Sequence, residues 1–299
     1  RTYSFHKIYY DEGSYIPDEV YDATTPCLAV HGIQKIIAST PAGTGGFFYK
    51  EWHNPDFKRY ERRTMECERV PRRFLLQEKK RMTRAQFAQE YEAAFTELAD
   101  GLFSSVLIHM SMKEINWELT RGRPCFLGVD FARFGADDNV IAYCFWDGST
   151  ARIKVEVFHG RHRLTSIVGR IVAIGKETPN IKKIVTDETG IGGGPTDELV
   201  LKFGKRKVLG IQNQRRVKDE TAPGRPSRYL KQDLYSNLIR LMENGQVELD
   251  DDIRILRSLR QVKYRYTKEG LLSIMGQDSH IAEAIVRAVF PLLGYKKIL

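Results

Sequence analysis

The sequence predicts an α/β protein, because short apolar runs of strand length alternate with longer segments whose apolar residues recur at helical spacing. Residues 126–131 and 183–187 have the length and apolarity of buried strands. The first run carries Asp130 and the second ends on Asp187. A carboxylate at the end of a buried strand needs a cation or a hydrogen-bond donor. Two such strands side by side would therefore gather two acids suited to a divalent metal ion.

The N-terminal part has two strand signals and a long helical pattern. Strands are predicted over residues 6–10 and 35–38, and the second is followed by a stretch rich in Pro and Gly that breaks the chain. Residues 71–99 have apolar side chains at helical spacing, with Thr83 as the N-cap of one helix. We therefore expect a first segment over residues 1–65, a helical linker over 66–119 and a second α/β domain over 120–299.

The second domain begins with three successive strands and ends with a helix. The strands are predicted over residues 126–131, 140–146 and 152–159, the last two joined by an Asp147-Gly148 turn. A helix over 164–176 then leads to the strand 183–187, a helix over 196–203 and a strand over 207–212. Further helices are predicted over 229–244 and 252–262, a strand over 271–275, and a last helix over 281–293 capped by Ser279.

Composition limits the classes of function. The 299 residues include 47 Lys and Arg against 38 Asp and Glu, a net charge of +9 that favours a polyanionic partner. No apolar stretch reaches the length of a membrane span, so no membrane association is expected. The four cysteines form no CxxC pair, which argues against a disulfide framework or a zinc site. The N-terminus lacks a signal-peptide pattern and enters a strand at once, as expected of a chain cut from a longer one.

The order of elements in residues 120–299 matches a ribonuclease H-like fold, a mixed sheet flanked by helices. Within it, residues 127–138, 187–199, 234–245 and 280–285 resemble the nuclease motifs and the intervening helix of the large terminase subunit of tailed double-stranded DNA viruses. Residues 8–17 resemble the Walker B strand of that family, 36–43 its ATPase coupling motif, and 71–91 its linker between motor and nuclease. The resemblance covers almost the whole chain.

The resemblance implies that residues 1–65 are a partial P-loop ATPase segment with four remnant residues, namely Asp11, Glu12, Ser39 and Thr40. No G-x-x-x-x-G-K-[ST] motif occurs in the sequence, so the phosphate-binding loop of such a motor is missing. We therefore expect this chain to have no ATP turnover of its own.

The resemblance also implies phosphodiester hydrolysis assisted by two divalent ions. Asp130 would bridge both ions, Asp187 would bind one and His280 the other. His280 stands where most members of the family have Asp, and an imidazole ligand favours Mn²⁺ over Mg²⁺. Further candidate metal ligands are Asp138, Asp278 and Glu283, of which Glu283 shares a helix face with His280. Strand-end carboxylates also serve as turn residues, and a histidine at a helix start is also found simply solvated.

A basic segment follows the second carboxylate. Residues 205–231 contain nine Lys or Arg against two acids, which predicts contacts with the DNA backbone, although a solvated charge run has the same composition. The nine candidates are Lys205, Arg206, Lys207, Arg215, Arg216, Lys218, Arg225, Arg228 and Lys231. The glycines over 190–194 suit either a phosphate-binding helix start or a tight turn beside the metal site.

The leading hypothesis is an endonuclease that cuts double-stranded DNA during viral genome packaging, in the cytoplasm of the host and at the procapsid. By resemblance, its partners would be the small terminase subunit and the portal protein. One alternative is a non-catalytic docking piece in which His280 has silenced cutting. Another is a different ribonuclease H-like nuclease, such as a junction resolvase.

Overall fold

The computed structural model describes residues 4–30, 34–96, 101–132, 137–217, 228–266, 272–276 and 278–293. The chain divides into two compact units, residues 1–99 with 266–271, and residues 100–265 with 272–299. The division falls inside the predicted linker over 66–119. The predicted boundaries at 65 and 119 stay predictions.

The first unit pairs two parallel strands and adds four helices. Tyr10, Tyr21 and Phe47 form a small aromatic core in which the Tyr21 and Phe47 rings stack. A second cluster, of Leu75, Phe87 and Tyr91, joins two of the helices. The elements are β1 Ile8–Asp11, β2 Lys35–Ala38, α1 Asp18–Thr24, α2 Gly46–His53, α3 Arg72–Arg81 and α4 Arg84–Glu92.

The second unit is built on a seven-stranded mixed sheet in the order β3-β11-β6-β5-β4-β7-β8. β4, β5 and β6 are antiparallel neighbours, whereas β7 lies parallel to β4, with β8 parallel to β7. The strands are β3 Met112–Lys113, β4 Cys125–Asp130, β5 Asn139–Trp146, β6 Ala151–Phe158, β7 Ile181–Asp187, β8 Val208–Ile211 and β11 Val247–Asp250. The parallel pairing of β4 with β7 through a crossover helix confirms the predicted α/β class.

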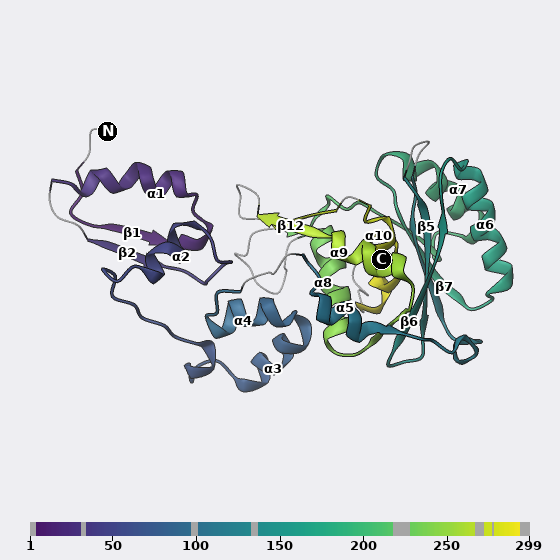
Figure 1. Cartoon of the computed structure of the whole chain (residues 1–299), viewed down its shortest axis with the longest axis horizontal. Coiled ribbons are helices and arrows are strands. Elements are labelled where there is room, and N and C mark those ends of the chain that lie inside the picture. The colour runs from purple at the N-terminus through teal and green to yellow at the C-terminus, as the bar shows by residue number, and fades with distance from the viewer. Residues whose placement is uncertain are drawn as a thin grey trace. The chain divides into compact units, whose positions relative to one another are not determined.

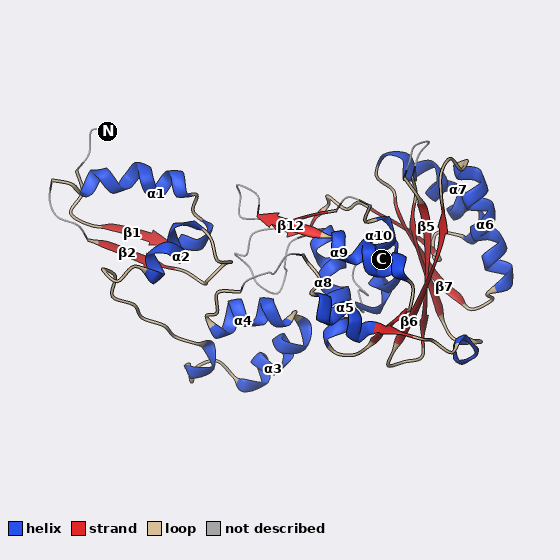
Figure 2. Cartoon of the chain, in the orientation of Figure 1, coloured by secondary structure: helices blue, strands red, loops and turns tan. Residues whose placement is uncertain are grey.

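Helices cover both faces of this sheet (Figures 1 and 2). α6 and α7 pack on one face, where α6 buries Ile167, Ile171 and Ile174 at helical spacing. The other face carries α5, α8, α9 and α10. The helices are α5 Ser105–Ser111, α6 Leu164–Glu177, α7 Gly193–Phe203, α8 Leu230–Glu243, α9 Ile253–Gln261 and α10 His280–Val289.

Two small two-stranded ribbons complete the described strands. β9 Arg216–Val217 pairs with β10 Arg228–Tyr229, and β12 Lys263–Tyr266 forms a ribbon with β13 Leu272–Met275. The last predicted helix is shorter than expected, because α10 gives way to a 3-10 turn over Phe290–Leu293.

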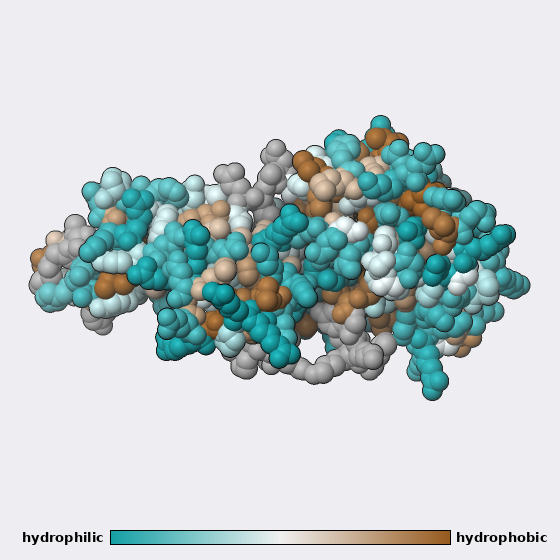
Figure 3. Space-filling view, turned by 90° about the horizontal axis from the view of Figure 1, so that it is seen from below, coloured by the Kyte–Doolittle hydropathy of each residue, from teal (hydrophilic) through white to brown (hydrophobic). Residues whose placement is uncertain are grey.

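The face of the molecule in Figure 3 is mostly hydrophilic, and its apolar residues lie in small groups. This surface fits the high proportion of charged residues, 28% of the sequence. Within the described part of the chain, no helix has both the length and the hydropathy needed to cross a membrane.

Candidate active site

Asp130 and Asp187 come together at one edge of the sheet. β4 ends on Asp130 and β7 ends on Asp187, and the parallel register pairs Val129 with Thr186, one residue before each acid. The carboxyl ends of neighbouring parallel strands meet at the same sheet edge. The two carboxylates predicted from the sequence therefore lie side by side, at what we term the carboxylate edge.

Helix α10 crosses β4 at very short range and brings its own polar residues to this edge. A Cβ atom at Gly128 would lie 2.0 Å from the carbonyl oxygen of Ala284 and 2.3 Å from the backbone nitrogen of Ala288. Only glycine permits this approach. His280, Glu283 and Arg287 of α10 are thereby held against the ends of β4 and β7.

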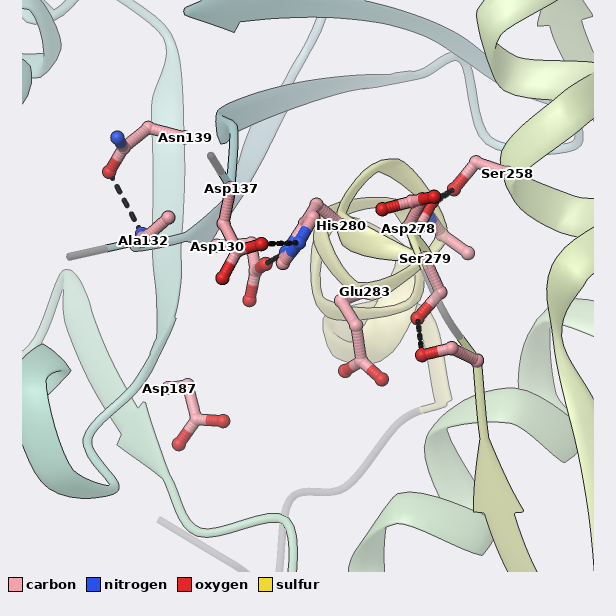
Figure 4. Close-up of polar contacts among 12 residues, drawn as sticks. Asp130, Ala132, Asp137, Asn139, Asp187, Ser258, Asp278, Ser279, His280 and Glu283 are labelled. Carbon is pink, nitrogen blue, oxygen red and sulfur yellow. Dashed lines mark hydrogen bonds and ion pairs between the residues drawn. The ribbon is translucent and has the colours of Figure 1, made fainter. Parts of the chain in front are cut away.

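His280 lies between two aspartates (Figure 4). Its Nδ1 is 2.8 Å from Asp130 Oδ2, and its Nε2 is 3.7 Å from Asp137 Oδ1. The hydrogen bond with Asp130 is the main reason that the pKa of His280 is raised, while burial acts in the opposite direction. Because Nδ1 faces the Asp130 carboxylate, it carries a proton, and Nε2 faces Asp137 on the other side of the ring.

Arg287, which the sequence analysis did not single out, joins the two strand-end carboxylates. Its Nη1 donates to Asp130 Oδ1 at 2.8 Å and its Nη2 to Asp187 Oδ2 at 3.0 Å. The side chain is only 1% exposed. Burial alone would lower the pKa of the guanidinium, but the charges of Asp130, Glu283 and Asp187 raise it overall. Arg287 is therefore a permanent buried cation at the centre of the site.

Glu283 is buried behind Arg287 and is already bonded on both oxygens. Oε2 accepts from Arg287 Nη2 at 3.1 Å, and Oε1 accepts from Tyr235 Oη at 2.8 Å and lies 2.7 Å from Lys231 Nζ. Burial raises the pKa of Glu283, but Arg287 and Lys231 bring it below its ordinary value. As arranged here, Glu283 holds the guanidinium in place and has no oxygen free of hydrogen bonds.

Asp187 is oriented by two further donors. The side-chain nitrogen of Asn213 donates to Asp187 Oδ2 at 2.8 Å, and the backbone N–H of Thr189 donates to Oδ1, also at 2.8 Å. The other end of the Asn213 amide, Oδ1, is buried without a hydrogen-bond partner in the described part of the chain. A buried amide oxygen without a donor normally has a partner such as a water molecule or an ion.

The donors at the carboxylate edge fit a hard divalent cation. Among the residues that the structure describes, no group of three or more His, Cys, Asp or Glu is arranged around one metal position, and Arg287 bonds to both strand-end carboxylates. Carboxylate and amide oxygens are nevertheless the ligands that Mg²⁺ and Mn²⁺ prefer. Asp130, Asp187 and Asn213 supply both kinds.

Two other predicted metal ligands have no hydrogen bond or ion pair with Asp130 or Asp187 in the described part of the chain. Asp138 is bonded to His159 beyond the end of β6, with 3.0 Å between Oδ2 and Nδ1. Asp278 is exposed and has a positive φ of 54°. Its backbone carbonyl accepts from Ser258, as Figure 4 shows, and within the described residues no hydrogen bond or ion pair links its carboxylate to the pair.

The glycine run over 190–194 forms a tight turn at the end of β7. Gly190–Gly192 is a 3-10 turn that leads directly into α7. A Cβ atom at Gly192 would lie 1.8 Å from the backbone carbonyl oxygen of Asp187, so the turn passes the backbone of Asp187 at a distance that only glycine allows.

The predicted basic segment is split between opposite edges of the sheet. Lys205, Arg206 and Lys207 precede β8, which runs parallel to β7, so they lie at the opposite edge from Asp187. The separation is the length of β7, about 23 Å. The DNA contacts predicted for the nine residues stay a prediction, and these three lie on the opposite side from Asp187.

The rest of the basic segment follows β8 on the carboxylate edge. Lys231 contacts Glu283, and Arg216 lies 5.9 Å from the centre of the Tyr229 ring. Arg215 stands next to Arg216, and its backbone pairs with that of Leu230. Lys218 and Arg225 lie outside the described residues, as does the side chain of Arg228.

The predicted ATPase remnants lie together in the first unit. Parallel pairing places Asp11, the last residue of β1, opposite Ala38, so that Glu12 lies near Ser39 and Thr40. The backbone N–H of Ser14 donates to Ser39 Oγ at 3.0 Å, and Ser14 Oγ donates to the carbonyl of Thr40 at 2.8 Å. Their role in nucleotide chemistry stays a prediction.

Comparison with known proteins connects the chain to one family. No protein-family model matches it. The large terminase subunits of Thermus phage G20c and of Thermus virus P23-45 are each 25% identical over 284 residues, which cover 87% of this chain and 55% of each relative. The chain thus spans about half the length of these relatives.

A solved structure agrees at the level of the fold. The large terminase of a thermophilic bacteriophage covers 97% of this chain and 71% of its own, with a TM-score of 0.58 and 11% identity. Together with the sequence relatives, it confirms the resemblance to large terminase subunits that the motifs indicated.

Proposed function

We propose that this chain, which resembles large terminase subunits in sequence and fold, is the nuclease-bearing part of a viral DNA-packaging enzyme. The observation that carries the proposal is the meeting of Asp130 and Asp187 at one sheet edge, with His280 and Arg287 bonded to them. This edge has more negative than positive charge: Asp130, Asp137, Asp187 and Glu283 against Arg287 and Lys231. Such an excess favours a divalent cation.

In this proposal, Asp130 and Asp187 hold the metal ion, with Asn213 as a neutral oxygen donor. When bound, Mg²⁺ or Mn²⁺ supplies the activation of water and the stabilisation of the leaving oxygen that phosphodiester hydrolysis needs. His280 Nδ1 keeps the Asp130 carboxylate in one orientation, and Thr189 and Asn213 do the same for Asp187. Mn²⁺ would be preferred over Mg²⁺ only if the His280 ring turned to bind the ion, because as arranged here Nδ1 is bonded to Asp130 and Nε2 faces Asp137.

The proposed substrate is double-stranded DNA, bound through its phosphates by the basic residues on the carboxylate edge, Arg215, Arg216 and Lys231. Action at the procapsid in the host cytoplasm, with a small terminase subunit and a portal protein as partners, follows from the family resemblance alone. ATP turnover is not proposed for this chain.

Plasmid cleavage tests the proposal. Supercoiled DNA is incubated with the purified chain in EDTA, Mg²⁺ or Mn²⁺, and nicked and linear products are measured. We expect cleavage in a divalent metal, its loss in Asp130→Asn, and its retention in Glu156→Gln, a carboxylate variant at an ion pair away from the site.

Two results would contradict the proposal. Absence of cleavage in every metal would favour the docking piece. Preferential cleavage of a four-way junction over linear duplex would favour a resolvase.

A further inference from the structure

We infer that Arg287 is the built-in second cation of this site, so that the carboxylate edge binds one divalent ion where a two-ion site was expected from the sequence. The inference rests on the proposed function, since it concerns the ion that the nuclease would use. It assigns Arg287 as a positioning residue that acts through the two strand-end carboxylates.

The contacts of Arg287 are those of a bridging cation. One guanidinium donates through Nη1 to Asp130 and through Nη2 to Asp187, at 2.8 and 3.0 Å. In a site with two ions about 4 Å apart, a shared carboxylate gives one oxygen to each ion. Here the Oδ1 atom of Asp130 faces the guanidinium, and a second divalent ion placed on it would meet a buried positive charge.

Arg287 is fixed where it is. Glu283 lies one helical turn before it and binds Nη2, and the other oxygen of Glu283 is bonded to Tyr235 and Lys231. Residues 281–289 of α10 are all buried, so the backbone that carries Arg287 is packed on every side. Withdrawal of the guanidinium would leave three carboxylates without their shared partner, which is a costly rearrangement.

In Asp187, as in Asp130, one carboxylate oxygen bonds to Arg287 and the other does not. Oδ2 of Asp187 accepts from both Arg287 and Asn213, which uses both lone pairs of that oxygen. Among the described residues, its Oδ1 accepts only the N–H of Thr189. One oxygen of each aspartate therefore faces the guanidinium, and the other oxygen of each is turned away from it.

The oxygens that do not bond to Arg287 are the donors that remain for an ion, and two of them accept one hydrogen bond each, from His280 and from Thr189. They include Oδ2 of Asp130 and Oδ1 of Asp187, and the buried Oδ1 of Asn213 has no partner among the described residues. With one divalent ion bound, the four carboxylates of the edge would face four positive charges, two from the ion and one each from Arg287 and Lys231. A second divalent ion would leave an excess of positive charge next to Arg287, which is itself buried.

Counting bound Mn²⁺ tests the inference without reference to catalysis. The full chain is dialysed to equilibrium against Mn²⁺, and the bound metal is measured per protein molecule. We expect about one ion at saturation for the wild type and for Arg287→Lys, which keeps the positive charge. Arg287→Gln removes the charge at similar length and is expected to bind about two.

Arg240→Gln is the matched control, because Arg240 is a half-buried arginine of α8 that bonds to Asn237 and not to the carboxylate edge. It is expected to bind one ion, like the wild type. If Arg287→Gln does not fold, two Mn²⁺ per molecule of the wild type or of Arg287→Lys would still overturn the inference.

Two Mn²⁺ per wild-type chain would overturn the inference, and plasmid cleavage by the same sample would leave the proposed function standing. No bound Mn²⁺ would overturn both the inference and the metal dependence of the proposed nuclease. One ion in Arg287→Gln would show that the guanidinium does not exclude the second ion, and would also overturn the inference.

Discussion

Two arginines of the second unit bind carboxylates in different settings. Arg170 of α6 joins Glu156 and Glu177 on a partly exposed surface; its side chain is 33% exposed, and its nitrogens lie 2.8 and 3.0 Å from the two carboxylates. Arg287 of α10 is 1% exposed and joins three carboxylates, those of Asp130, Asp187 and Glu283.

The difference lies in the charge balance rather than in the bonds. Glu156 is also influenced by Lys154, so the group around Arg170 is close to neutral. At the carboxylate edge, four acids face two permanent cations. A balanced network requires nothing more, whereas an unbalanced buried one calls for a further cation. This excess, together with its place at strand ends, separates a candidate active site from a structural ion pair.

The comparison predicts very different costs for removing each arginine. Arg287→Met is expected to lower the free energy of unfolding by about 3–5 kcal/mol, because it leaves buried carboxylates unpaired. Arg170→Met is expected to lower it by about 1 kcal/mol or less, because its ion pairs are partly exposed. Urea denaturation of both variants without divalent metal measures the two values. Equal losses of unfolding free energy in the two variants would contradict the predicted difference between a buried and a partly exposed arginine.

His280 extends the comparison, because among the described residues it bonds to Asp130 but not to Asp187, whereas Arg287 bonds to both. His280→Ala is expected to weaken Mn²⁺ binding and plasmid cleavage by about 10–100-fold, as for loss of a residue that orients a metal ligand. His280→Asn, which restores a donor near Asp130, is expected to recover part of the loss. Titration of Mn²⁺ into each variant gives the affinity, and an unchanged affinity in His280→Ala would contradict this role.

The two halves of the basic segment provide a test at opposite edges of the sheet. Changing Arg215 and Arg216 together to Gln is expected to reduce the slope of log affinity for duplex DNA against log salt by about 2, since each phosphate contact contributes about 0.9. The matched control changes Lys205, Arg206 and Lys207 to Gln at the far edge and is expected to leave the slope unchanged. Fluorescence anisotropy across a salt series measures both. A larger effect in the control would place the DNA elsewhere.

The hairpin carboxylate Asp147 represents an acid with only a structural task. Backbone N–H groups of Ser149 and Thr150 bond to it and lower its pKa below the ordinary value near 4. A depressed pKa contributes stability that is present above the unfolded pKa and is lost as pH falls through the folded one. Asp147→Asn is therefore expected to destabilise the protein by about 1 kcal/mol at pH 7.

The difference between wild type and Asp147→Asn should shrink once the pH drops below 4. Thermal unfolding of both proteins between pH 7 and pH 3 measures it. A difference that stays constant over this range would contradict the assignment.

Much of the fold follows from local sequence, because the buried strands β4, β5 and β7 are apolar runs with clear ends. The strand β11, Val247–Asp250, was not predicted, because it is stabilised by its neighbours β6 and β3, which lie far away in the sequence. The last helix was predicted too long because Phe290–Leu293 remains apolar after α10 has ended.

The role of Arg287 could not be predicted from local sequence patterns. Arg287 bonds to acids 100 and 157 residues away in the sequence. The one signal in the sequence is the pair Glu283 and Arg287, the only charged residues between 281 and 290 in an otherwise apolar helix. A charged pair four residues apart in a fully buried helix indicates polar partners elsewhere in the core.

The most direct test of the account is the anomalous diffraction of crystals of this chain grown with Mn²⁺. The account predicts one manganese peak beside Asp130 and Asp187, with the Arg287 guanidinium still bonded to both. No peak at the carboxylate edge, or two peaks with Arg287 turned away, would contradict it.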